Sequence, residues 1–130
     1  MTVSRLDRMP PVGAAMTPFP YFVDASDPPE DAVRLMGEHA IRHVPVLSEG
    51  RVVGIVSARA PHVVVPDPYV VEISTPLDEV VATMAQRRIG SAVVVKKGKL
   101  AGILSVTDVC RVLAELLRQR FPASGGDDAA

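Results

Sequence analysis

The chain carries a tandem repeat, and this repeat limits the folds it can adopt more than any other feature. Residues 18–60 align without gaps on residues 66–108, and 14 of the 43 aligned pairs are identical. Biased use of Val, Ala and Pro explains only about three or four such matches. Two copies are too few for a solenoid, which needs at least three stacked units. We therefore expect two similar units packed sheet to sheet around a pseudo-twofold axis.

Each copy predicts the element order β-α-β-β-α, which places the chain in the mixed α/β (α+β) class. A short extended segment comes first, and a helix is expected over residues 28–40 in copy one and 76–88 in copy two, from the spacing of apolar residues. Asp27 and Thr75 are the predicted N-caps, because each stands directly before a proline that suits the first helical position.

Two short Val-rich strands follow each helix. The first pair is separated by Glu49-Gly50 and the second by Lys97-Gly98. A polar residue followed by Gly between such runs is typical of a tight hairpin turn. We expect one β-hairpin in each copy.

The two copies end differently. Copy two continues into an amphipathic helix over about residues 107–120, whereas copy one stops abruptly at Pro61 and has lost or shortened this helix. The predicted organisation is a disordered tail over 1–12, a first unit over 13–62, a second unit over 63–121 and a disordered tail over 122–130.

Composition excludes several classes of function. A net charge of −1 and the lack of a basic run argue against binding to nucleic acid or to an anionic membrane. The single cysteine, Cys110, cannot form an intramolecular disulfide, and no apolar stretch suits a signal peptide or a membrane span. We expect a soluble, cytoplasmic protein.

The stretch MTPFPYFVDASDPPEDAVRLMGEHAIRHVPVLSEGRVVGIVS resembles a cystathionine-β-synthase (CBS) domain, and copy two resembles another. Together they are similar to a Bateman module over about residues 16–121. The resemblance implies a regulatory pair that binds an adenosine-containing ligand (AMP, ADP, ATP or S-adenosylmethionine) between its motifs and forms homodimers. It also implies signalling to a separate effector protein.

In the CBS family, a segment of pattern G-h-h-[ST]-x-x-D supplies a hydroxyl and a carboxylate to the ribose. This segment matches Gly102, Ser105 and Asp108 here, with Thr107 beside them. A carboxylate can accept both hydrogens of a cis-diol. The alternative is that Thr107 or Asp108 only caps the last helix.

The resemblance assigns phosphate contacts to a basic pair before the strand of the other motif, here Arg42 and His43. The alternative is a solvated pair at the negative end of a helix. Ser74 and Thr75 resemble the segment of the family near the base and phosphate, although a capping role explains Thr75 equally well.

The symmetry-related site lacks both kinds of group. It would combine Ser57 and Ala60 with Gly90 and Ser91, so the acid and the basic pair are missing. We therefore expect a single nucleotide site. Arg59 and the lysines near residue 97 are expected on solvated surfaces.

An enzymatic function is not expected. Cys110 lies in an apolar helical stripe, which predicts a buried structural thiol, and the histidines lack metal-binding spacing. No phosphate-binding loop or dinucleotide motif is present, so no required cofactor or metal is predicted. The alternative function is a ligand-free dimerisation or interaction module. Its contact stripe would be Leu113, Leu116, Leu117 and Phe121.

Overall fold

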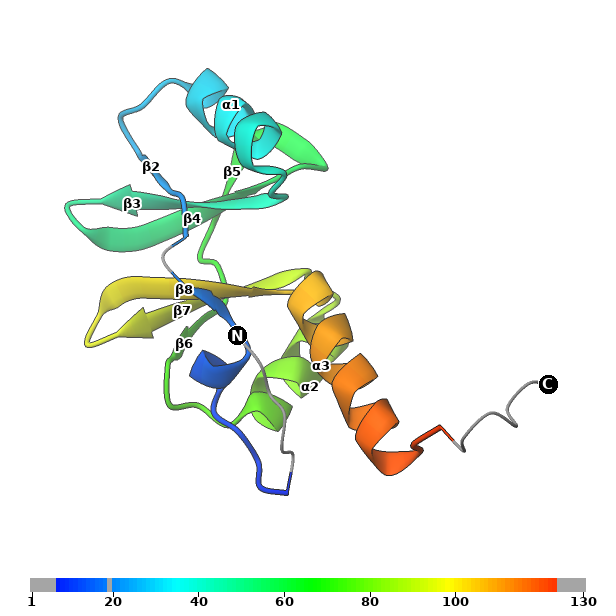
Figure 1. The fold of residues 1–130 in the computed structure, drawn as a ribbon. Helices are drawn as coiled ribbons and strands as arrows, with labels where there is room; N and C mark the ends of the chain where they lie inside the picture. Colours follow the sequence, from blue (N-terminus) through cyan, green and yellow to red (C-terminus); the bar gives the residue numbers. More distant parts are fainter. Residues whose placement is uncertain (1–6, 19, 124–130) are drawn as a thin grey trace.

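Two four-stranded sheets lie face to face in the computed structural model, which describes residues 7–18 and 20–123 (Figure 1). The first sheet has the strand order β2-β3-β4-β5 and the second β1-β8-β7-β6, and this confirms the predicted mixed α/β class. The elements are η1 (Val12–Ala14), β1 (Thr17–Pro18), β2 (Val23–Asp24), α1 (Pro29–His39), β3 (His43–Ser48), β4 (Arg51–Ser57), β5 (Ala60–Pro66), β6 (Val70–Glu72), α2 (Leu77–Arg87), β7 (Ser91–Lys96), β8 (Lys99–Ser105) and α3 (Val106–Arg120).

The two predicted hairpins are confirmed, as β3–β4 and β7–β8. Each turn places two residues at positive φ: 52° and 79° at Glu49-Gly50, and 52° and 78° at Lys97-Gly98. Positive φ at both central residues is the geometry of the type I′ turn, which matches the twist of the strands. Both hairpins also carry a bulge at equivalent positions, so the repeat holds in detail.

The helices begin one residue later than expected, and both predicted N-caps are wrong. Pro28 and Pro76 are the N-caps, with ψ of 146° and 136°, so each proline lies before its helix rather than in it. Pro28 must be extended because another proline follows it. Asp27 instead accepts a hydrogen bond from the N–H of Asp24 at 2.8 Å, within the turn before α1.

The two copies exchange their first strands. In β1, Pro18 pairs with Gly102 of β8, in copy two. In β5, Pro66 pairs with Gly54 of β4, in copy one. Because these two pairs are related by the 48-residue offset of the repeat, the leading strand of each copy completes the sheet of the other (Figure 1). Among the described residues, copy one lacks the last helix, as predicted, and Pro61 lies inside β5, which follows β4 after a two-residue turn.

The N-terminal segment is anchored from residue 10 onward to the start of α2 and to the loop that precedes it, so the predicted tail through residue 12 is too long. The carbonyl of Pro10 accepts a hydrogen bond from Leu77, and the N–H of Val12 donates to Thr75 at 2.7 Å. Val12 is fully buried. Residues 1–6 and 124–130, which hold most of the predicted tails, lie outside the described residues.

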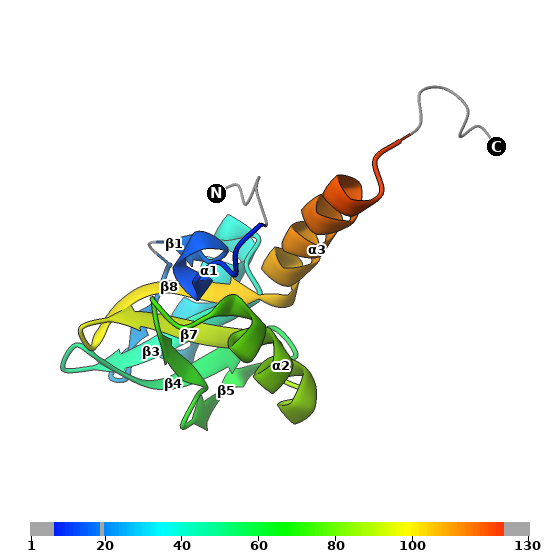
Figure 2. The same ribbon diagram turned by 90° about the horizontal axis from the view of Figure 1, so that it is seen from below.

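The second core is the larger of the two, because η1 and α3 both pack against it. Val109 and Val112 of α3 contact this core, whereas the far half of the helix extends away from the body (Figure 2). The first sheet is covered by α1. Its strand β4 passes into β5 through only two residues, Ala58 and Arg59, where copy two continues into α3. No helix among the described residues is long and apolar enough to cross a bilayer.

Candidate ligand-binding cleft

A cleft of about 750 Å³ lies where the two sheets meet, and both copies line it. Its volume falls within the range of about 300–1,000 Å³ that is usual for sites of small molecules. The residues that line it are Thr17, Pro18, Pro20, Tyr21, Ala40, Ile41, Arg42, His43, Ser57, Ala58, Arg59, Gly90, Ile103, Ser105, Val106, Thr107, Asp108 and Arg111.

Two equivalent corners of the repeat form the walls of the cleft. In copy one, the N–H of Ala58 donates to the carbonyl of Arg42 at 2.8 Å. In copy two, the N–H of Val106 donates to the carbonyl of Gly90 at 3.1 Å, the same bond shifted by 48 residues. Gly90 also lies under His43, because a Cβ there would be 3.3 Å from His43 Nε2. The two corners therefore face each other across the pseudo-twofold axis.

Asp108 is a buried charged group on the wall of the cleft. Its side chain is 3% exposed. One carboxylate oxygen accepts from the N–H of Ser105 at 2.8 Å and from its hydroxyl at 3.0 Å. The other accepts from the Thr17 hydroxyl at 3.0 Å and from the Arg111 guanidinium at 2.9 Å. A buried charge with this many partners is well compensated.

Ser105 and Asp108 together form a capping box at the start of α3. The N–H of Asp108 donates to the Ser105 hydroxyl at 3.3 Å, and Ser105 is the N-cap. Asp108 therefore takes part in the cap of this helix, which is the structural half of the alternative prediction, whereas Thr107 has no capping role and is exposed. The same two side chains form the cap and line the cleft.

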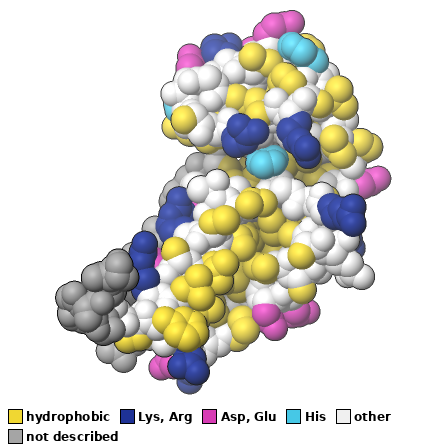
Figure 3. All heavy atoms as spheres, turned by 90° about the vertical axis from the view of Figure 1, so that its right-hand side faces the viewer, with side chains coloured by type: hydrophobic (Ala, Val, Ile, Leu, Met, Phe, Trp, Pro, Cys, Tyr) yellow, Lys and Arg dark blue, Asp and Glu magenta, His cyan; other side chains and the backbone are white. Residues whose placement is uncertain are grey.

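Arg42 and His43 come from the start of β3, on the opposite wall. Burial lowers the pKa of His43, and the adjacent Arg42 guanidinium lowers it further. His43 is therefore neutral near pH 7 and donates one N–H rather than adding a charge. Figure 3 shows a histidine between two basic side chains at the waist of the molecule.

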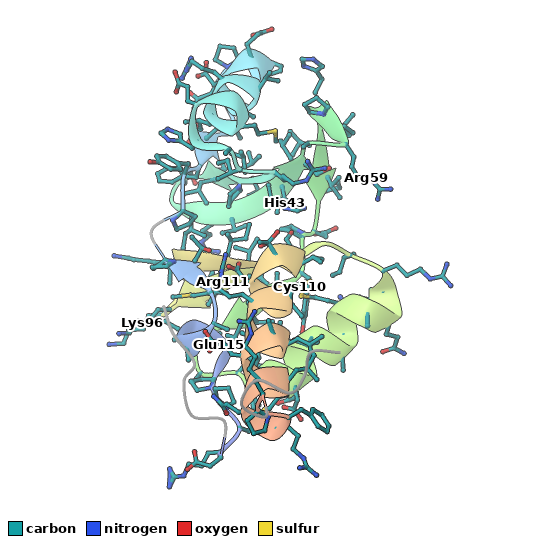
Figure 4. The ribbon with its side chains drawn as sticks, turned by 45° about the vertical axis from the view of Figure 1, so that its right-hand side comes forward. His43, Arg59, Lys96, Cys110, Arg111 and Glu115 are labelled. Atoms are coloured by element: carbon teal, nitrogen blue, oxygen red, sulfur yellow. The ribbon has the colours of Figure 1, made fainter. Side chains whose placement is uncertain are left out.

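Arg59 is exposed and lies in a turn, as predicted, but it also lines the cleft, whereas the sequence predicted a position outside the site. It belongs to the two-residue turn between β4 and β5, which the bond from Ala58 holds beside Arg42. In Figure 4, His43 and Arg59 lie above the start of α3, which carries Arg111. The exposed lysines Lys96, Lys97 and Lys99 do not line the cleft.

Three predicted site residues do not line the cleft: Gly102, Ser74 and Thr75. A Cβ on Gly102 would lie 2.7 Å from the Thr17 carbonyl oxygen, so this glycine permits close packing of β1 on β8. The Thr75 carbonyl accepts a hydrogen bond from the N–H of Val12, and Ser74 is exposed.

Sequence reasoning missed Thr17, Tyr21 and Arg111. Arg111 follows Asp108 by three residues, a spacing at which opposite charges meet on a helix, and this signal could have found it. The Tyr21 ring stacks on His39, with centroids 3.7 Å apart. Thr17 reaches Asp108 only because of the strand exchange, which leaves no local signal.

Cys110 is exposed, which contradicts its predicted burial in α3. The apolar stripe that suggested burial contacts the core only through its first turns, and Cys110 lies on the other side of the helix from this contact. Among the residues that the structure covers, no three His, Cys, Asp or Glu side chains gather into a group that could hold a metal ion.

The family comparison matches the chain twice. The model of the CBS domain matches residues 12–60 and 62–115, one match for each copy. Among curated proteins, none matches the chain significantly.

Solved structures with the same fold are numerous, and three illustrate the range. A Vibrio cholerae protein described as an acetoin utilization protein (AcuB) is 28% identical, with a TM-score of 0.77 over 90% of this chain and 99% of its own. CBSX2 in complex with AMP is 26% identical, with a TM-score of 0.74 over 84% and 99%. The CBS domain pair of MJ0100, solved with 5′-methylthioadenosine and S-adenosylmethionine, is 19% identical, with a TM-score of 0.76 over 82% and 98%. This last likeness shows the fold alone.

Proposed function

The chain belongs to the CBS domain family as a tandem pair, and we propose that it is a regulatory module that binds an adenosine-containing ligand in the cleft between its two copies. One observation carries the proposal. The cleft sets the hydroxyl and carboxylate corner of copy two, Ser105 and Asp108, against the basic corner of copy one, Arg42 and His43. The complex of CBSX2 with AMP supports a ligand of this class.

In this proposal Asp108 binds the ribose hydroxyls, as in the family pattern. Its oxygens already accept bonds, so a ribose must replace one of the present donors. Arg111 is the donor that can leave, because its side chain is 56% exposed and remains solvated when it moves. Thr17 and the N–H of Ser105 then keep the carboxylate oriented.

Ligand binding should raise the thermal stability of the protein. At a ligand concentration of 100 times Kd, binding to the native state alone adds about 2.7 kcal/mol to the free energy of unfolding. We therefore expect Tm to rise by about 6–12 °C with at least one of AMP, ADP, ATP and S-adenosylmethionine. Differential scanning fluorimetry measures the shift. If Tm does not rise with any of the four ligands at millimolar concentration, the proposal is wrong.

Self-association is a second candidate function, and the surface of α3 favours it. Leu113, Leu116 and Leu117 are 50%, 41% and 48% exposed, and Phe121 beyond them is 68% exposed. Figure 3 shows a hydrophobic band over the lower half of the molecule, on the side where α3 lies. We propose that a second copy covers this stripe, in line with the homodimers of the family, and that bound ligand biases the geometry of the dimer.

Replacing Leu117 with glutamate should break this dimer, because it places a charge in the middle of an apolar contact. Light scattering should give a mass near twice 13.8 kDa for the natural chain and near 13.8 kDa for the variant. Lys97→Glu is the matched control, since it also changes an exposed side chain to glutamate, and it should stay dimeric. A monomeric natural chain at high micromolar concentration would count against this candidate.

A further inference from the structure

The charges on the cleft are strongly unbalanced. Three arginines line it, Arg42, Arg59 and Arg111, against one carboxylate, Asp108. That carboxylate is already paired with Arg111 at 2.9 Å. Arg42 and Arg59 form no ion pair with any residue that the structure describes. Since His43 is neutral, two uncompensated guanidinium groups remain on the wall contributed by copy one.

The asymmetry of the repeat explains why Arg59 is there. Arg59 is the repeat equivalent of Thr107, and Ala60 is the equivalent of Asp108. In copy two these positions lie in the first turn of α3, and Asp108 forms part of its capping box. In copy one the chain turns back at once into β5, with Ser57 paired to Ala60. The corner of copy one, which has Ala60 in place of the carboxylate, therefore carries the guanidinium of Arg59 in a tight turn.

We infer that the degenerate corner of copy one is the phosphate-binding arm of the ligand site, with Arg59 as a binding residue beside Arg42, and that the ligand carries two or more phosphate groups. This inference rests on the proposed function and narrows its ligand class. A guanidinium fork matches the geometry of phosphate oxygens, and two forks on one wall of the cleft suit a chain of phosphates. The ribose end of such a ligand lies at the Asp108 corner.

The charge of the ligand follows from this arrangement. ATP and ADP carry more negative charge than AMP, adenosine is neutral, and S-adenosylmethionine carries a sulfonium cation. Like charges placed together disfavour a partner, so the two unpaired arginines select against S-adenosylmethionine. The expected order of affinity is ATP, ADP, AMP, adenosine, with S-adenosylmethionine weaker than AMP.

Calorimetric titration of the full chain tests the inference with these five ligands and with tripolyphosphate. Arg59→Ala should weaken ATP and tripolyphosphate binding about tenfold, AMP binding about twofold, and leave adenosine unchanged. Arg51→Ala is the matched control, because Arg51 is an exposed arginine at the opposite end of β4 and does not line the cleft. It removes the same charge and should change no affinity. Arg59 is an exposed turn residue, so Tm should not change.

The outcomes separate this inference from the proposed function. Three results would overturn the phosphate arm and leave the adenosine site in place. Adenosine could bind as tightly as ATP, or S-adenosylmethionine could bind most tightly of all. In the third case, Arg59→Ala would lower the affinity for every ligand by the same factor. Tripolyphosphate binding that depends on Arg59, with no binding of any adenosine compound, would support the arm and refute the adenosine site. No binding of any of the six compounds would overturn both.

Discussion

Replacing Asp108 with alanine is expected to lower the free energy of unfolding by about 2–4 kcal/mol and to lower Tm by about 10 °C. The carboxylate closes the capping box of α3, and its loss leaves the Ser105 N–H and the Thr17 hydroxyl without their acceptor. The same change should reduce nucleotide affinity at least about tenfold, because a ribose loses a charged acceptor. If both effects are measured, one residue joins the stability of a helix to the proposed ligand binding.

Chemical denaturation and calorimetry at a temperature where both proteins are folded measure the two effects separately. Asp78→Ala is the control, since Asp78 is also an acid in the first turn of a helix but is exposed. Asp78→Ala should lower the free energy of unfolding by less than about 1 kcal/mol. If Asp108→Ala proves as stable as the natural chain, the carboxylate does not hold the cap. If it loses stability but binds nucleotide normally, Asp108 is a structural residue only.

Replacing Gly102 with valine is expected to lower the free energy of unfolding by about 2–3 kcal/mol. A Cβ at this position would lie 2.7 Å from the Thr17 carbonyl oxygen and would also collide with Met16. The backbone of Thr17 cannot move aside as a flexible side chain can, so β1 must move away from β8 to make room for the valine. Met16 is buried in the second core, and its contacts would be lost with the strand.

Urea unfolding measures the loss, and hydrogen exchange locates it. Amides of residues 12–18 should exchange faster in Gly102→Val. Gly37→Ala is the control, because nothing lies within 4 Å of a Cβ at Gly37 and alanine is the better helix former. It should raise stability by about 0.5–1 kcal/mol. Unchanged stability and unchanged exchange in Gly102→Val would mean that β1 does not pack on β8 as described.

Local chemistry predicted the elements well. The turns at Glu49-Gly50 and Lys97-Gly98 are confirmed because a polar residue followed by Gly is a two-residue signal, and both residues take the positive φ that the type I′ turn requires. The helices begin one residue later than expected because each proline before a helix stays extended, and this small difference removed both predicted N-caps. Cys110 was misplaced for a different reason: an apolar stripe shows which face can be buried, not how far along the helix a partner extends.

The cleft was predicted in part. Ser105, Asp108, Arg42 and His43 all line it, because each stands at a strand end or in the first turn of the helix that follows, and the repeat indicates these positions. Gly102 does not, since a glycine in a strand fits a close backbone contact as well as a ligand. Arg59 was assigned to solvent because a charge beside a turn is usually solvated. Its place on the cleft depends on the opposite corner, which the local sequence does not specify.

The 48-residue repeat establishes the number of units, their element order and the asymmetry between Ala60 and Asp108. Which strand completes which sheet was decided only in three dimensions. Pro18 pairs with Gly102 and Pro66 pairs with Gly54, although Pro18 and Gly102 lie far apart in the sequence. The free energy of such pairings comes from register and close packing rather than from residues nearby in the sequence. That exchange brings Thr17 to Asp108, and the short turn into β5 brings Arg59 beside Arg42.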